Sequence, residues 1–278
     1  MKKQLSIIPN LLTTGNLVCG FLAIILAVND ALKLANYNDF VRPFVFSSWL
    51  LLLAMIFDLL DGIVARLTKT DSKFGMQLDS LADLTSFGVA PAVILYLAVL
   101  RYHGKMGVLI AAIYAVCAAL RLARFNLIDK VDHKNFAGLP TPAAAGVLAS
   151  YVLFSHWGEW YYASSPILFL DKVIGWYAEN VTNLNMRVIP AMMILIALLM
   201  VSNLRFISLK QYVKKERAPF IVFVAVVLLI LILIIKPEPM FFAVTLGYVV
   251  FGLVRGVYLE LKREGKIVKK QKEKAHGR

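Results

Sequence analysis

The chain has 278 residues, of which 60% are hydrophobic, and its mean hydropathy is +0.73. A soluble domain of this size is roughly half apolar, so this composition excludes a water-soluble globular protein and indicates one that lies in a lipid bilayer. The formal net charge of +13 would suit nucleic acid, but the basic residues gather beside apolar runs, which favours the membrane surface as their partner and not nucleic acid.

Apolar runs long enough to cross a bilayer as helices recur along the whole chain. The first follows Lys2 and Lys3 but lacks the small-residue cleavage site of a signal peptide, so we expect it to be retained. The sequence thus predicts an all-α integral membrane protein with about eight transmembrane helices and a single membrane domain, 1–278. The expected spans are about residues 11–29, 44–66, 76–100, 107–125, 141–156, 188–201, 220–235 and 240–260.

The positions of lysine and arginine predict the orientation of these spans. Under the positive-inside rule, the basic loops and the basic tail 262–278 predict that both termini lie in the cytoplasm. We expect the protein to lie in the cytoplasmic membrane of the cell. The tail also suits contact with anionic lipid headgroups. On the opposite side, the aromatic-rich segment 157–187 predicts a loop that lies along the headgroup layer, with a short interfacial helix near 167–177.

Four aspartates at the junction of the second and third spans are the most informative residues. Asp58 and Asp61 are three apart near the end of one span, and Asp79 and Asp83 are four apart near the start of the next. Both spacings put the paired carboxylates on one helical face. Because a helix rises about 1.5 Å per residue, the two pairs can meet at one level, close to the cytoplasmic surface.

Such a group of acids needs positive charge beside it. An aspartate at the centre of a membrane helix costs roughly 2.5–3.5 kcal/mol on insertion scales, and somewhat less near the interface. Arg66 supplies one positive charge. That charge would suffice for a salt bridge with one aspartate, but beside four aspartates it leaves negative charge uncompensated. We therefore predict one or two hard divalent cations held by carboxylate oxygens.

Small residues lie close to the same acids. Gly62, Ala65 and Gly75 leave space beside the backbone, which suits either a bulky ligand or the close approach of another helix.

Together these residues resemble the signature of the CDP-alcohol phosphotransferases. The signature covers eight fixed positions and is matched without departure, as Asp58-x2-Asp61-Gly62-x2-Ala65-Arg66-x8-Gly75-x3-Asp79-x3-Asp83. The resemblance implies a six-helix core, about 1–205, with two additional helices at about 219–260. It also implies a homodimer and a site for two divalent cations, Mg²⁺ or Mn²⁺, that is open to the cytoplasm.

The same resemblance implies a role for each matched residue. Asp58, Asp61 and Asp79 correspond to metal ligands, and Asp83 to a ligand that also acts as the general base. The remaining matched positions correspond to those that hold the CDP moiety, namely Gly62, Ala65, Arg66 and Gly75. The residue types suit the chemistry, since metals can bridge a pyrophosphate and a positioned carboxylate can deprotonate an attacking hydroxyl.

Further segments resemble the membrane-embedded phosphatidylserine synthases within that family. These segments are Pro9–Asn16, Ser86–Pro91, Arg121–Asn126 and Phe136–Ala144. The resemblance implies CDP-diacylglycerol as the donor, L-serine as the acceptor and CMP as the leaving group.

Several polar residues in these segments are candidates for substrate contacts. Arg121 and Arg124 suit either the serine carboxylate or a lipid phosphate, although positive-inside anchoring explains either one equally well. Asn126 would orient a ligand or cap its helix. Asn10 and Asn16 would contact the CDP-lipid, with capping of the helix start an equal alternative.

Two rival functions remain open from the sequence. One is the same transfer with glycerol phosphate or inositol as acceptor, or with an archaeal ether lipid as donor. The other is a cation or proton transporter, because such proteins also cluster acids within the membrane. The position of all four acids at the cytoplasmic edge favours the enzyme.

Overall fold

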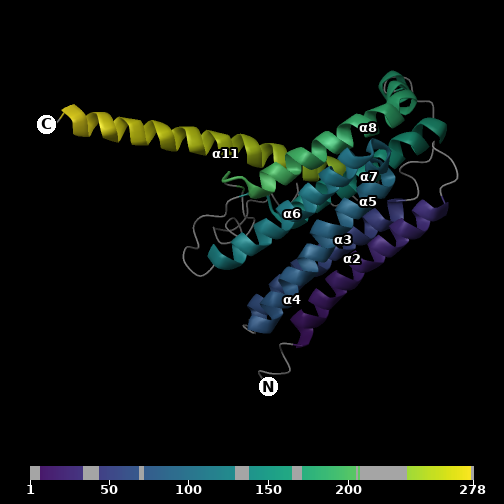
Figure 1. Ribbon diagram of the computed structural model, residues 1–278, viewed down its shortest axis with the longest axis horizontal. Coiled ribbons are helices and arrows are strands. Elements are labelled where there is room, and N and C mark those ends of the chain that lie inside the picture. The colour runs from purple at the N-terminus through teal and green to yellow at the C-terminus, as the bar shows by residue number, and fades with distance from the viewer. Residues whose placement is uncertain are drawn as a thin grey trace, which may run out of the picture.

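The computed structural model describes residues 7–33, 44–68, 72–128, 138–164, 171–204, 206 and 237–276. Its helices lie side by side in an elongated bundle, and the last one carries the C-terminus away from that bundle (Figure 1). In chain order the described helices are α2 (Ile7–Lys33), α3 (Val45–Thr68), α4 (Lys73–Asp83), the π-helix η2 (Leu84–Val89), α5 (Ala90–Ala98), the 3₁₀-helix η3 (Leu100–His103), α6 (Lys105–Ile128), α7 (Thr141–Ser164), α8 (Asp171–Val201) and α11 (Pro237–His276).

Six stretches in this part of the chain are long and apolar enough to cross a membrane, so the protein is an all-helical integral membrane protein. They are Ile7–Lys33, Val45–Ala65, Lys73–Ala98, Lys105–Asn126, Leu184–Val201 and Pro237–Gly256. Each overlaps a predicted span. The predicted span 141–156 lies in α7, which is helical but is not among the six, and 220–235 lies outside the described residues.

The predicted loop 157–187 is wrong for most of its length. α7 continues to Ser164, and α8 begins at Asp171 and runs unbroken to Val201, so the expected short helix near 167–177 is, from 171 on, the first part of α8. With 31 residues, α8 is about 46 Å long, which exceeds a hydrocarbon core of about 30 Å. Its aromatic residues at 176 and 177 therefore belong to a helical extension of a span.

The buried face of α2 explains why this helix packs tightly against the rest of the bundle. Its buried residues recur every three or four positions, as expected for one helical face: Pro9, Thr13, Asn16, Cys19, Gly20, Ala23 and Ala27. Small residues allow membrane helices to approach closely. The polar members, Thr13 and Asn16, lie toward the N-terminal end, which is also the end of the bundle where α4 lies (Figure 1).

The chain entering α7 is tied to the end of α8. The backbone N–H of Gly138 donates to the Leu204 carbonyl (2.9 Å), and that of Leu139 donates to the Leu199 carbonyl (3.0 Å). Gly138 has a φ of 89°, and a Cβ there would collide with the Met200 carbonyl oxygen. Glycine is required at this turn because other residues strain at positive φ.

α11 packs against α7 through polar and aromatic contacts. The hydroxyls of Ser150 and Thr245 are 2.8 Å apart, and the rings of Phe154 and Phe242 stack at 5.0 Å between centroids. The helix continues as far as His276, so the basic segment predicted as a tail is helical from 262 to 276.

Candidate active site

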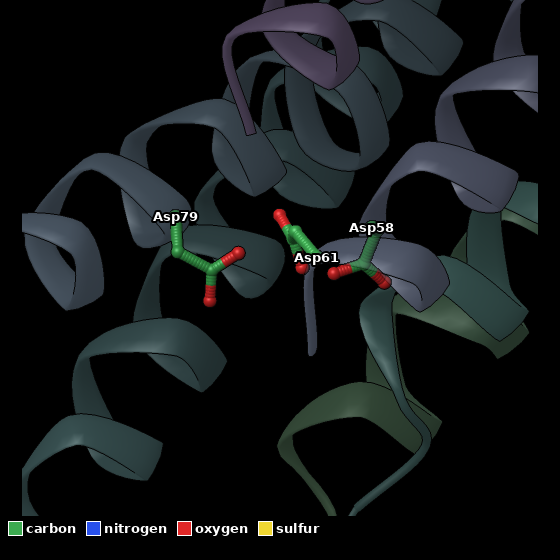
Figure 2. Close-up of side chains that lie close together, drawn as sticks. All are labelled: Asp58, Asp61 and Asp79. Atoms are coloured by element: carbon green, nitrogen blue, oxygen red, sulfur yellow. The ribbon is translucent and has the colours of Figure 1, made fainter. Parts of the chain in front are cut away.

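Three of the four predicted aspartates meet between α3 and α4. One carboxylate oxygen from each of Asp58, Asp61 and Asp79 lies within 4.8 Å of the other two. Figure 2 shows the three side chains turned toward a common space, with Asp58 and Asp61 from one helix and Asp79 from the other. The convergence predicted from the helical spacing is therefore found.

These residues suit a hard divalent cation. Mg²⁺ and Ca²⁺ bind carboxylate oxygens at about 2.0–2.6 Å, so two oxygens on opposite sides of one ion are about 4–5 Å apart. The spacing of the three aspartate oxygens agrees with that requirement. Asp61 is only 6% exposed, and burying its charge beside two other carboxylates is costly unless a cation offsets it.

Asp83 lies beside these three aspartates but is not among those whose oxygens come within 4.8 Å of one another. It is 8% exposed and interacts electrostatically with Asp58, Asp61 and Asp79. The amide of Asn16 donates to its Oδ1 atom at 3.1 Å. This hydrogen bond stabilises the negative charge of Asp83, and Arg121 is attracted to Asp83 at longer range.

The first helix contributes a residue that the sequence analysis missed. The hydroxyl of Thr13 lies 2.8 Å from Asp61 Oδ2 and 3.0 Å from the Pro9 carbonyl oxygen. Thr13 and Asn16 are three apart on the buried face of α2, and each donates to a different aspartate. The signal available in the sequence was this spacing of two polar residues in an apolar span.

The residues predicted to hold the CDP moiety fall into different surroundings. Among the described residues, no atom lies within 4 Å of a Cβ built on Gly62 apart from its own helix backbone, so space is open there beside this glycine. At Gly75 a Cβ would approach Asn10 Oδ1 to 2.9 Å and Ser72 Oγ to 3.0 Å. Gly75 and Asn10 therefore lie together where the start of α4 meets α2. Ala65 is half-buried, and the side chain of Arg66 lies outside the described part.

The three residues predicted to contact the acceptor also have different surroundings. Arg121 donates to the buried Thr141 hydroxyl (3.1 Å) and is attracted to Asp83. Arg124 instead donates to the Val201 carbonyl (3.4 Å) and to Asn203 Oδ1 (2.7 Å) at the end of α8. These bonds satisfy a helix C-terminus, whose last carbonyls lack partners within the helix.

Asn126 joins α6 to α4. Its amide donates to Ser80 Oγ at 3.0 Å, and Ser80 follows Asp79 directly in α4. Of the three acceptor candidates, Arg121 is the one for which the described residues give an electrostatic attraction to an aspartate of the site.

A π-helical turn, η2, follows Asp83 directly and was not foreseen. Ser86 and Phe87 in this turn are fully buried, and the Tyr114 hydroxyl donates to the Phe87 carbonyl oxygen at 3.0 Å. A π-helix is rare, and single π turns inside α-helices occur frequently at functional sites.

Comparison with known proteins supports the same region. The family model for CDP-alcohol phosphatidyltransferases matches residues 6–182. The chain is 32% identical over 260 residues to a CDP-diacylglycerol–serine O-phosphatidyltransferase of Helicobacter pylori strain J99, covering 93% of this chain and 94% of that protein.

Two archaeal proteins match a shorter part. An archaetidylserine synthase of Methanothermobacter thermautotrophicus is 38% identical over 154 residues, which cover 55% of this chain and 60% of that protein. A CDP-diacylglycerol–serine O-phosphatidyltransferase of Methanocaldococcus jannaschii is 41% identical over 128 residues, which cover 46% and 61%. From the family match and the near full-length similarity, the chain belongs to the CDP-alcohol phosphatidyltransferase family of enzymes.

Proposed function

We propose that this enzyme transfers the phosphatidyl group of CDP-diacylglycerol to the hydroxyl of L-serine and releases CMP. The observation that carries the proposal is the convergence of Asp58, Asp61 and Asp79 around one space, with Asp83 beside it, within the segment that matches the family model. Similarity to a serine transferase over 93% of the chain supports serine as the acceptor.

The proposed division of labour follows from where the carboxylates lie. Asp58, Asp61 and Asp79 would hold the divalent cations, Mg²⁺ or Mn²⁺ and two in number, with Asp83 as a further ligand. Such cations would supply positive charge that favours the departure of CMP. Gly62 leaves room for the nucleotide, with Ala65, Arg66, Gly75 and Asn10 around it.

Asp83 acts as the general base. The serine oxygen attacks the phosphorus that bears the diacylglycerol, its proton passes to Asp83, and the bond from that phosphorus to the oxygen of CMP breaks. Asp83 is well suited because Asn16 bonds only one of its oxygens. Arg121, which lies near Asp83, attracts the serine carboxylate and brings the hydroxyl toward the base.

The remaining parts of the proposal concern the whole protein. Residues 1–205 form the catalytic core of a single membrane domain, two identical chains form a dimer, and the site faces the cytoplasm, as do both termini.

An acceptor panel with the purified protein tests this function. CDP-diacylglycerol in mixed micelles is offered with radiolabelled serine, glycerol 3-phosphate or inositol, and both CMP and lipid products are measured. We expect label in lipid from serine alone, with one CMP released per lipid formed. Equal or greater transfer to another acceptor would overturn the serine assignment, and ion flux into proteoliposomes without CMP formation would favour a transporter.

A second donor belongs in the same panel because one relative is an archaetidylserine synthase. The ether analogue of the CDP-lipid should be used less efficiently than CDP-diacylglycerol. A preference for the ether lipid, at equal concentrations, would assign the chain to that alternative.

A further inference from the structure

Asn16 lies in an unusual position for an asparagine in a membrane helix. Its side chain is 0% exposed, and its Nδ2 atom donates to Asp83 Oδ1 at 3.1 Å. Among the described residues, its Oδ1 atom has no hydrogen-bond partner. Burying an amide with an unsatisfied oxygen is costly, so a mere packing role does not account for this residue.

Asn16 is itself held in place by the turn that follows Asp83. The hydroxyl of Ser86 donates to the Asn16 carbonyl oxygen at 2.9 Å, and Ser86 is fully buried. The two bonds are reciprocal, because α2 donates to Asp83 and the adjoining turn donates back to α2. Moving this part of α2 away from Asp83 would therefore break both bonds.

A close backbone approach makes this pair of bonds possible. A Cβ added to Gly20, one turn after Asn16, would lie 2.7 Å from the Ser86 Cα atom. Real Cβ atoms do not approach another backbone so closely, so glycine is required here. At this point both the backbone and the side chain of Ser86 pack directly against Gly20.

The π-helical geometry of η2 sets the direction in which Asp83 leaves its helix. A π turn accommodates one extra residue, which rotates the residues before it relative to those after it. The Tyr114 hydroxyl bonds the Phe87 carbonyl oxygen from α6, while Ser86 bonds α2. Hydrogen bonds to α2 and from α6 thus stabilise the π-helical turn, and Asp83 is the residue that precedes it.

We propose that Asn16 is a positioning residue for the general base, in that its amide fixes the orientation of Asp83 while Ser86 fixes Asn16. This inference rests on the proposed function, because it takes Asp83 as the group that accepts the serine proton. With Oδ1 bonded to Asn16, the Oδ2 atom is the one presented to the hydroxyl. A misplacement of about 1 Å in a reacting group can cost about 10²-fold in rate.

The test replaces Asn16 with Ala and, as a second variant, with Leu, which has the same branched skeleton but cannot donate. Initial rates of serine transfer give kcat and the KM for each substrate, and electron paramagnetic resonance titration gives the affinity for Mn²⁺. We expect kcat to fall about 10²-fold in both variants. The KM for CDP-diacylglycerol should stay within about threefold, and the Mn²⁺ affinity should fall far less than kcat does, because the three converging ligands Asp58, Asp61 and Asp79 are untouched.

Asn185 supplies the matched control. It is 1% exposed and bonds Tyr151 and Ser155 in another part of the bundle, so Asn185→Ala also removes a buried amide. That variant should lower the melting temperature and leave the kcat of the folded protein within about twofold. A comparable fall in kcat for Asn185→Ala and Asn16→Ala would overturn the positioning role and indicate general loss of structure.

Ser86→Ala tests the second half of the inference. Because Ser86 acts through Asn16, its removal should lower kcat less than Asn16→Ala does, and the double variant should be no slower than Asn16→Ala alone. Independent, multiplying effects would overturn the link between the two residues.

The two proposals fail in different ways. If the unaltered chain transfers no label to serine, the proposed function fails, and the Asn16 variants are then measured with whichever acceptor the panel supports. If the unaltered chain is active and Asn16→Ala keeps its kcat, or loses kcat and Mn²⁺ affinity in equal measure, the inference about Asn16 fails alone.

Discussion

Asp61 and Asp83 are the two aspartates of the site that the bundle buries most, at 6% and 8% exposed. Each accepts a hydrogen bond from α2, the first from Thr13 and the second from Asn16. Hydrogen bonds to a charged carboxylate are about twice as strong as those between neutral groups. Substitution of either a carboxylate or its α2 donor is therefore expected to impair the site.

Asp83→Asn should reduce serine transfer by about 10²- to 10⁴-fold, the usual contribution of a general base. The amide cannot take the proton of the attacking hydroxyl, whereas the three-carboxylate cluster proposed to hold the metal remains. Binding of CDP-diacylglycerol, measured by equilibrium binding of a labelled analogue, should change little. Asp58→Asn serves as the contrast and should weaken metal and nucleotide binding together; full activity in either variant would contradict its assigned role.

Thr13→Val should raise the Mg²⁺ concentration needed for half-maximal activity by about 10-fold, because residues that orient metal ligands typically contribute 10- to 100-fold in affinity. The change keeps the shape of the side chain and removes the hydroxyl that bonds Asp61. Thr14→Val is the matched control, since Thr14 is exposed and bonds the carbonyl of Asn10 in its own helix. An equal response of the two variants to Mg²⁺ would rule out this role for Thr13.

Gly62→Ala distinguishes two roles for this glycine, namely room for a ligand and close packing of helices. A Cβ at this position meets nothing within 4 Å in the part of the chain that the structure describes, so the melting temperature should hold or rise slightly, as alanine favours helix by about 0.5–1 kcal/mol. The KM for CDP-diacylglycerol should rise several-fold if the nucleotide occupies that space. An unchanged KM would place the nucleotide elsewhere.

At the scale of the helices, the site is assembled by the close contact of α2 with the π-helical turn η2. Gly20 permits that contact, and Ser86 and Tyr114 stabilise the turn from two sides. The elements that carry Asp79 and Asp83 thus depend on a helix that lies far earlier in the chain. Packing between these helices therefore positions two of the aspartates to which the proposed function assigns catalysis.

Gly20→Ala should destabilise this contact by about 1–3 kcal/mol, the usual cost of overpacking, and should lower activity as well. The added methyl would meet the Ser86 backbone, which cannot move as a side chain could. In Gly247→Ala, by contrast, the methyl on α11 would meet none of the described residues, and the melting temperature should not fall. Thermal unfolding of both variants in detergent checks the difference, and equal melting temperatures would contradict the proposed packing.

At the scale of the whole molecule, several helices pack around the aspartate carboxylates of the site. α2, α3 and α4 supply the four carboxylates and their donors, while α6 adds Arg121, which is bonded to Thr141 at the start of α7. If the proposed cations are bound, their removal would leave mutual repulsion among the acids and would weaken the whole assembly.

Chelation by EDTA should therefore lower the melting temperature of the purified protein, and excess Mn²⁺ should restore it. A ligand at 100 times its Kd stabilises the folded state by about 2.7 kcal/mol. The Asp58→Asn variant should respond much less, because one ligand is lost. An identical melting temperature with and without metal in the unaltered protein would argue against a bound cation in the resting state.

Much of the site could be predicted from the sequence because helical periodicity is a local property. Spacings of three and four placed Asp58 with Asp61, and Asp79 with Asp83, on common faces, and the structure brings three of them within 4.8 Å. The long apolar runs likewise indicated the spans. Composition alone could not tell a polar loop from a helix that extends beyond the membrane, and for that reason 157–187 was predicted wrongly.

The sequence by itself determined the membrane environment and the acidic cluster, because hydrophobicity and helical spacing depend on neighbouring residues. Only the tertiary structure decided which polar side chains serve that cluster. The bonds from Thr13 to Asp61 and from Asn16 to Asp83 join residues 48 and 67 positions apart, and Arg124 bonds an asparagine 79 positions away. Such pairings depend on how helices dock and rotate against one another, which local spacing does not specify.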